Sequence, residues 1–386
     1  MDATTLRRVT MPSTAEIERR YRKLREAMEH AGVDALVVTG TEYTGFEGGI
    51  RYVSGFRIVH RYTYVVLPLD GEPVSLFPAE ARWVGVHAEP WIERQEFPQV
   101  PGDWIREEAE KRGWRRIGVY GLDFVMPVRD YRALSAGDVE LVPFDQEFDT
   151  ARAVKSDEEL ELVRDSLAIN EEGFWALVRA YEPGRTESEL MAAAEALFVE
   201  RGTGRRTMNM VLSGRGGSAE PEFKIPDHQR PVEPDDLLLY SLEIAGPGGY
   251  WTEFARPLIR GELSAESRRM FDAYHACFEA ATRTLRDGAT AQDVHRAVAE
   301  PLEDEGYPLG HVTGHSIGTT MIEFPRIGEG EESTVLRENM IISIHPHVIS
   351  TDGQSCLYMQ ETFRVGRDGG EALSGVPITT FDGTEA

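Results

Sequence analysis

The sequence contains only two cysteines, Cys277 and Cys356, among its 386 residues. Two thiols are too few for a disulfide framework or a thiolate metal cage, so the fold has to depend on its hydrophobic core. Long apolar runs are also missing, and the N-terminal stretch MDATTLRRVT is polar rather than signal-like. These absences favour a protein without membrane contact in a reducing compartment, which we expect to be the cytoplasm.

Positive charge is scarce as well. Lysine and arginine number 41 against 66 acidic residues, which gives a formal net charge of −25 at pH 7 and a pI near 4.9. A surface of this sign repels phosphate backbones, and no stripe of basic residues reverses it locally. We therefore expect no nucleic-acid partner. The hydrophobic content of 41% and charged content of 28% are typical of an ordinary globular protein.

The length predicts two domains in one chain. Residues 1–153 alternate helix-like and strand-like segments, which indicates a small α/β domain. Residues 154–386 open with Ser156 followed three positions later by Glu159, the signature of a capping box at the start of a long amphipathic helix. We therefore place the domain boundary just before this helix.

The second domain contains an internal repeat. Residues 184–202 and 288–306 match in outline, each with a threonine cap, an acidic residue three positions later, an apolar helix and a closing glycine. Strand-rich segments follow at 237–259 and 340–365. This pattern predicts a duplicated unit of helix plus hairpin, with two halves that face each other across a pseudo-symmetric cleft.

The first hairpin is expected to bring two carboxylates together. A three-residue loop at 247–249 places Gly246 opposite Tyr250 and therefore Glu243 opposite Glu253. Directly opposed residues have Cβ atoms roughly 4.5–5.5 Å apart, where like charges are destabilising unless a cation or a shared proton intervenes. The pair is a metal site or a site of perturbed pKa values, unless both side chains turn outward to solvent.

Histidines gather in the last quarter of the sequence. His311 and His315 lie in a glycine-rich segment, and their spacing suits two metal ligands, one ligand and one substrate contact, or polar loop residues. His345 and His347 interrupt the apolar strand NMIISIHPHVIS on one face, with no preference between them. Glu361 lies in the apolar context LYMQETFRV, where a carboxylate needs a buried partner. Together, three glutamates and at least two histidines form a chemically sensible dinuclear set for a first-row metal.

The order of these motifs resembles the pita-bread family that includes methionine aminopeptidase, aminopeptidase P, prolidase and creatinase. YRKLREAMEHAGVDALVVT followed by IRYVSGF is similar to the N-terminal domain of the prolidase and creatinase branch, and VKSDEELELVRDS to the helix that opens the family's catalytic domain. The likeness covers nearly the whole chain. It implies an α+β fold, with a smaller creatinase-type α/β domain at 1–153 and a pita-bread catalytic domain of duplicated α-β-β units at 154–386.

The resemblance implies a set of five metal ligands, with changed residue types at three of the five positions. Glutamate replaces aspartate at the first two positions, and histidine replaces the glutamate that precedes proline. All five can bind one or two divalent transition metals, Fe, Mn or Zn. The first hairpin is one residue shorter than usual, and creatinase keeps the fold without the metal, so a metal-free site stays open. The five ligands are Glu243, Glu253, His315, His345 and Glu361.

The resemblance also implies substrate-site residues. His311 matches a substrate-site histidine of aminopeptidase P, and His228 is the only histidine in the region upstream of the first hairpin, where the peptidases carry one. Arg326 and Arg61 look like counterparts of the creatinase arginines that bind the substrate carboxylate, with Arg61 reaching in from the partner subunit's N-terminal domain. Ile322 stands where the peptidases use a histidine to stabilise the tetrahedral intermediate.

These features favour a small-molecule hydrolase or lyase that cleaves a C–N or related bond in a carboxylate-bearing substrate. We expect a cytoplasmic homodimer in which each N-terminal domain lies near the partner's active site. The alternatives are an Xaa-Pro dipeptidase or aminopeptidase, and a catalytically inactive pita-bread binding protein. The retention of five coordinating side chains favours an enzyme, because random decay would more often leave alanine, serine or glycine.

Overall fold

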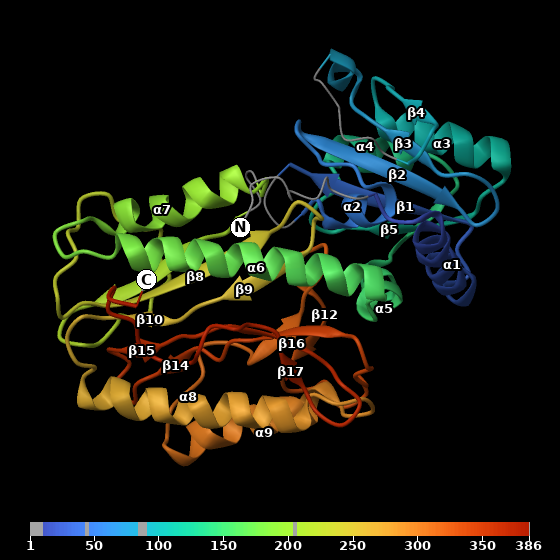
Figure 1. Ribbon diagram of the computed structural model, residues 1–386. Helices are drawn as coiled ribbons and strands as arrows, with labels where there is room; N and C mark the ends of the chain where they lie inside the picture. The colour runs from blue at the N-terminus through green and yellow to red at the C-terminus, as the bar shows by residue number, and fades with distance from the viewer. Residues whose placement is uncertain (1–10, 43–45, 84–90, 204–206, 386) are drawn as a thin grey trace. The chain divides into compact units, whose positions relative to one another are not determined.

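The computed structural model describes residues 11–42, 46–83, 91–203 and 207–385, so the polar stretch MDATTLRRVT lies outside the described residues. The chain divides into two compact units, Met1–Arg152 and Ala153–Ala386 (Figure 1). Within the described residues, no helix combines the length and the apolar character needed to cross a membrane.

The first unit is built on a six-stranded sheet with the order β4-β3-β2-β1-β5-β6. Strand β1 is central, antiparallel to β2 and parallel to β5. The strands are β1 (Ala35–Thr41), β2 (Tyr62–Pro68), β3 (Val74–Leu76), β4 (Gln95–Glu96), β5 (Arg116–Tyr120) and β6 (Glu140–Pro143). The helices are α1 (Thr14–Ala31), α2 (Gly48–Ser54), the short 3₁₀ helix Ala79–Trp83, α3 (Pro101–Arg112), α4 (Val128–Leu134) and α5 (Asp145–Ala153).

Local sequence signals account for the ends of α1. The side chain of Ser13 accepts a hydrogen bond from the backbone N–H of Glu16 at the N-terminus of the helix. Gly32 ends the helix in the left-handed conformation at φ 66°, where a Cβ atom would be strained. The chain then enters β1, in which six consecutive residues are buried because helices cover both faces of a central strand.

In the second unit two helix pairs enclose the sheets. The pairs are α6 (Asp157–Ala180) with α7 (Glu187–Glu200), and α8 (Ala265–Thr284) with α9 (Ala291–Asp304). Figure 1 shows α6 and α7 outside β8 and β9, and α8 and α9 on the opposite side, next to the second group of strands. The predicted Ser156–Glu159 capping box is present. Matching capping boxes begin α7 and α9, so the duplicated α-β-β fold is confirmed.

The sheets of the second unit follow the repeat. The first has β8 at its centre, paired with β7, β9 and β10, and the second has the order β12-β11-β13-β16-β17. The first sheet comprises β7 (Met210–Gly214), β8 (Leu237–Ala245), β9 (Trp251–Phe254) and β10 (Pro257–Leu258). The second comprises β11 (Gly314–Ser316), β12 (Glu323–Ile327), β13 (Ile341–Ile344), β16 (Glu361–Arg364) and β17 (Glu371–Ala372), and β14 (Val348–Ile349) pairs with β15 (Cys356–Leu357).

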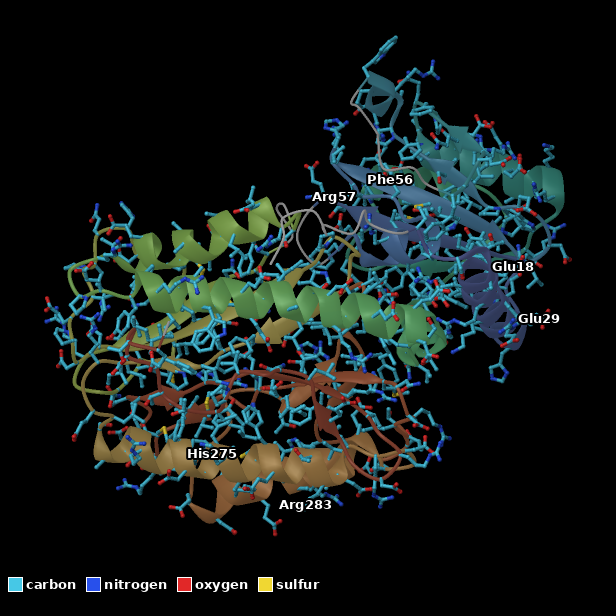
Figure 2. All side chains as sticks on the ribbon, viewed as in Figure 1. Glu18, Glu29, Phe56, Arg57, His275 and Arg283 are labelled. Atoms are coloured by element: carbon cyan, nitrogen blue, oxygen red, sulfur yellow. The ribbon has the colours of Figure 1, made fainter. Side chains whose placement is uncertain are left out.

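Side chains fill the space between the helices and the sheets (Figure 2). Helix α8 has a buried face and an exposed face. Cys277 on this helix is fully buried, while Arg283, labelled in Figure 2, is exposed. The other cysteine, Cys356, is buried as a free thiol too. Burial raises the pKa of both thiols to about 12, so neither is a reactive thiolate at neutral pH.

Candidate metal centre

The first hairpin has the register that the sequence predicts. Strands β8 and β9 pair Glu243 with Glu253, and the backbone N–H of Gly246 donates to the carbonyl of Tyr250 at 3.1 Å. The alternative of two outward-facing side chains is wrong, because Glu243 and Glu253 are only 5% and 2% exposed. Two carboxylates thus share one buried face at the centre of the unit.

Glu253 forms a cluster with two histidines. Its Oε1 lies 3.4 Å from Nε2 of His315 on β11, and its Oε2 lies 3.7 Å from Nε2 of His345, which follows β13. One potential ligand atom from each of the three residues lies within 4.8 Å of the others. The pairing of β11 with β13 brings the two histidines together, because it sets His315 opposite Ser343, two residues before His345.

The two imidazoles are in the state that a metal ligand requires. Nδ1 of His315 lies 3.0 Å from the carbonyl oxygen of Ser316, so Nδ1–H donates there and leaves the Nε2 lone pair facing Glu253. Burial lowers the pKa of His315 and holds that of His345 well below its usual range. Both ring nitrogens of His345 are buried without a hydrogen-bond partner among the described residues. A neutral imidazole with an unused buried nitrogen beside a carboxylate fits a transition-metal cation.

The carboxylates are strongly perturbed. Burial, reinforced by the charge of Glu253, raises the pKa of Glu243 to about 8, and burial raises that of Glu253 in the same direction. Ser241 donates from Oγ to Oε1 of Glu243 at 2.7 Å, and the hydroxyl of Ser343 donates to Oε2 of Glu253. These hydroxyls oppose the shift without cancelling it, so the pair requires a proton or a cation.

The prediction that Glu361 is a ligand needs correction. Its carboxylate forms a buried ion pair with Arg256 and accepts the N–H of Ser374 at 3.2 Å. Burial still raises the pKa of Glu361, with Arg256 opposing the shift. Its neighbour Gln360 faces the cluster instead, with Nε2 3.0 Å from Oε1 of Glu243. Consecutive residues of a strand point to opposite faces, so an error of one residue in register exchanges the ligand for its neighbour.

A second group of side chains lies beside the cluster. The ring of His311 is 5.3 Å from that of His345, and the ring of His347 is 5.5 Å from that of His311. Tyr358 and Phe223 close the group, with ring centroids 4.8 Å apart. His311 therefore lies next to the candidate ligands, as the resemblance implied. The sequence signals for the two aromatic residues are weak, because neither belongs to a motif.

His228 does not join this group, and its catalytic role stays a prediction. It is exposed on the loop between β7 and β8, beside Asp227. Among the described residues, no hydrogen bond or ring contact links it to the cluster. The same loop supplies Phe223, because the backbone of Lys224 pairs with Val211 of β7 and holds the preceding residue over His347.

The arginines and Ile322 occupy different environments. Arg326 on β12 is exposed and directly opposite His315 in register, so the two side chains share a face. Its charge contributes to the lowered pKa of His315, after burial. Arg61 lies in the first unit, where its guanidinium pairs with Glu80. Ile322 is 45% exposed, at the position where the peptidases carry a histidine.

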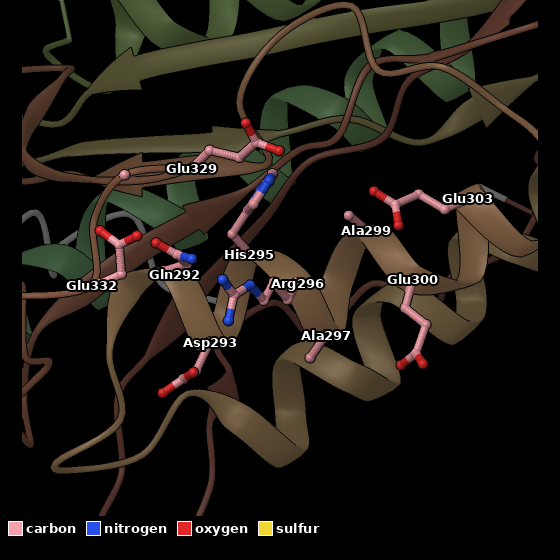
Figure 3. A pocket seen from close by; sticks show the side chains of 11 residues that line it. Gln292, Asp293, His295, Arg296, Ala297, Ala299, Glu300, Glu303, Glu329 and Glu332 are labelled. Atoms are coloured by element: carbon pink, nitrogen blue, oxygen red, sulfur yellow. The ribbon is translucent and has the colours of Figure 1, made fainter.

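A separate groove of about 770 Å³ lies along α9 (Figure 3). Its rim is acidic, and it contains none of the predicted site residues. Gln292, Asp293, His295, Arg296, Ala297, Ala299, Glu300, Glu303, Glu329, Gly330 and Glu332 line it.

Comparison with known proteins agrees with this architecture. Residues 161–367 match the model of metallopeptidase family M24, and residues 20–154 match that of the creatinase/prolidase N-terminal domain. The chain therefore belongs to metallopeptidase family M24. It is an enzyme of the hydrolase class that carries a creatinase-type N-terminal domain.

Relatives extend along most of the chain. A Xaa-Pro dipeptidase of Pyrococcus furiosus is 22% identical over 86% of this chain and 91% of its own length. The agropine synthesis cyclase of Rhizobium rhizogenes is 27% identical over 94% and 96%. The X-Pro aminopeptidase of Thermotoga maritima superposes with a TM-score of 0.79 at 21% identity, covering 94% of this chain and 99% of that one. The structural likeness confirms the pita-bread fold.

Proposed function

We propose that the protein is a metal-assisted hydrolase or lyase that cleaves a C–N or related bond in a small, carboxylate-bearing substrate. The observation that carries this proposal is the buried cluster of Glu253, His315 and His345, with Arg326 on the same face as His315. A divalent Fe, Mn or Zn ion held by these ligands would act as a Lewis acid on the scissile group. Binding of the substrate carboxylate and proton transfer are assigned to side chains.

Arg326 is assigned to the substrate carboxylate. Its guanidinium is exposed, and among the described residues no carboxylate lies within ion-pair distance of it. Arginine binds carboxylates through two parallel N–H···O bonds, which fixes the orientation of the substrate as well as its charge. A substrate held there has its reacting end directed towards His315 and the cluster.

His311 is assigned to proton transfer. Its Nδ1 lies 2.7 Å from the carbonyl oxygen of Val312, so Nδ1–H donates and Nε2 is left to accept a proton. Burial lowers the pKa of His311, which keeps the ring neutral and ready to act as a base at neutral pH. The ring of Phe223 lies beside this ring, at a centroid distance of 6.3 Å and an interplanar angle of 29°.

The peptidase alternative is less well supported. Several relatives are named Xaa-Pro dipeptidases, but Ile322 cannot donate a hydrogen bond to a developing oxyanion. The relative named a cyclase aligns over 94% of the chain, which favours chemistry on small molecules other than peptides. We also propose a homodimer in which Arg61 contributes from the partner subunit's first domain.

A substrate panel with a matched arginine pair tests the proposal. Arg326→Gln should raise KM about 10- to 100-fold for small amides and lactams that carry a carboxylate, the value of one or two charge-assisted hydrogen bonds. KM for the same compounds as neutral carboxamides should not change. Arg337→Gln, at an exposed arginine, serves as the control. Equal effects on charged and neutral substrates would contradict the assignment.

A further inference from the structure

We infer that the centre binds a single cation through Glu253, His315 and His345, and that Gln360 fills the place that a second cation would need. This inference rests on the metal-assisted function proposed above and adds the number of ions. The contacts of the five side chains at the centre carry it.

The donor set suffices for one ion. Two neutral imidazoles and one carboxylate make a tridentate site that suits Zn, Mn or Fe and leaves coordination positions for substrate or water. A second dication would need anionic ligands of its own. In the part of the chain that the structure describes, Glu243 is the other carboxylate in contact with this group, since Glu361 forms its ion pair with Arg256 instead.

The amide of Gln360 lies where the two carboxylates meet. Its Nε2 is 3.0 Å from Oε1 of Glu243 and 3.4 Å from Oε2 of Glu253. Only the nitrogen of an amide can donate, so two carboxylates fix this end of the side chain towards them. The N–H groups present partial positive charge at the position from which a bridging cation would contact both glutamates.

The other contacts of Gln360 hold it there. Its Oε1 lies 3.0 Å from Oγ of Ser241, whose single hydroxyl hydrogen it shares with Glu243, and its Nε2 also lies 3.0 Å from the hydroxyl oxygen of Tyr358. The side chain is completely buried. Because both ends of the amide are engaged, displacing it would leave several buried polar groups unpaired at once.

The test compares metal content in the full-length protein. Protein loaded with Mn²⁺ and freed of excess ions is measured by element analysis and by electron paramagnetic resonance. The wild type should hold one ion per chain and give the spectrum of an isolated ion. Gln360→Glu should take up a second ion and give the spectrum of a coupled pair. Gln354→Glu, at an exposed glutamine, should match the wild type, and His345→Ala should lose the ion.

Three other results of the metal measurements would overturn the inference. Two ions or a coupled spectrum in the wild type would show that Gln360 does not exclude the second ion. A single ion in correctly folded Gln360→Glu, checked by circular dichroism, would show that another feature sets the number. If neither the wild type nor Gln360→Glu bound an ion, the centre would not be a metal site at all. One ion without turnover of any carboxylated substrate would instead contradict only the proposed function.

Discussion

At the scale of the residue, the neighbouring pair Gln360 and Glu361 shows how one position decides a role. Both are polar side chains in an apolar strand, and only the direction in which each points distinguishes them. Glu361 meets Arg256, which is itself fully buried, whereas Gln360 meets the glutamates of the hairpin. We therefore assign the carboxylate of Glu361 to stabilising the fold and the amide of Gln360 to the candidate metal centre.

The ion pair of Glu361 predicts a large loss of stability on removal of its partner. Arg256→Met should lower the free energy of unfolding of the second unit by about 3–5 kcal/mol, because it leaves a buried carboxylate uncompensated. Metal content should not change, as Glu361 is not a ligand. Arg164→Met, at an exposed arginine of α6, should cost less than about 1 kcal/mol. Loss of the metal in a folded Arg256→Met protein would contradict this division of roles.

Ile322 predicts weak peptidase activity. The loss of one donor to the tetrahedral intermediate typically lowers turnover about 100- to 1000-fold. Hydrolysis of Xaa-Pro dipeptides should accordingly stay far below the roughly 10 per second of an ordinary enzyme. Release of free proline gives the rate directly. A turnover of roughly 10 per second would instead favour the alternative that the protein is an Xaa-Pro dipeptidase.

At the scale of the element, the hairpin of β11 and β12 is tied to the start of α6. Nζ of Lys155, just before the helix, lies 3.0 Å from Oε2 of Glu323 on β12, and both side chains are buried. The backbone N–H of Lys155 also donates to the carbonyl of Asn339 at 3.1 Å. These bonds connect the first half of the repeat to the strands that carry His315.

Removal of this lysine should loosen the second half of the repeat. Lys155→Met removes the buried cation that faces the buried carboxylate of Glu323, at an expected cost of about 3–5 kcal/mol. Lys111→Met, at a lysine whose side chain is 73% exposed, should change stability by less than about 1 kcal/mol. Denaturant midpoints of the two variants give the comparison. Equal midpoints would mean that the buried pair contributes nothing.

At the scale of the whole molecule, the opposed glutamates couple stability to pH. The folded metal-free protein holds protons on Glu243 and Glu253 that the unfolded chain releases, since their pKa values are raised from 4.5 to about 8. Stability therefore falls as pH rises between these values. The buried histidines act in the opposite direction only below their ordinary pKa of 6.5, so the window from 6.5 to 8 isolates the glutamates.

Chelated protein should therefore lose stability from pH 6.5 to pH 8, by up to roughly 1.4 kcal/mol per pH unit for each carboxylate. Glu253→Gln should reduce the slope, and Glu161→Gln, at an exposed position of α6, should leave it unchanged. Added Mn²⁺ should restore stability at pH 8, because it binds only the folded state. A rise in the stability of chelated protein over this window would reverse the assigned sign.

Local patterns in the sequence determined much of this protein. Ser156 with Glu159 sets the start of α6. The short loop after Gly246 sets the register that opposes Glu243 and Glu253, because a turn of given length fixes strand pairing. The order of the motifs along the chain was also sufficient to predict the family and the fold, because each motif corresponds to one local helix, strand or turn.

Only the tertiary structure decided which side chains meet. The strand pattern alone gives no preference between His345 and His347, the family resemblance selects His345, and packing of β13 beside β11 places His345 against Glu253. It also hides the partner of Glu361, because Arg256 lies 105 residues away and is reached only when β16 packs beside the end of β9. Contacts between distant segments depend on the direction of each side chain after packing, and a shift of one residue in a strand reverses that direction.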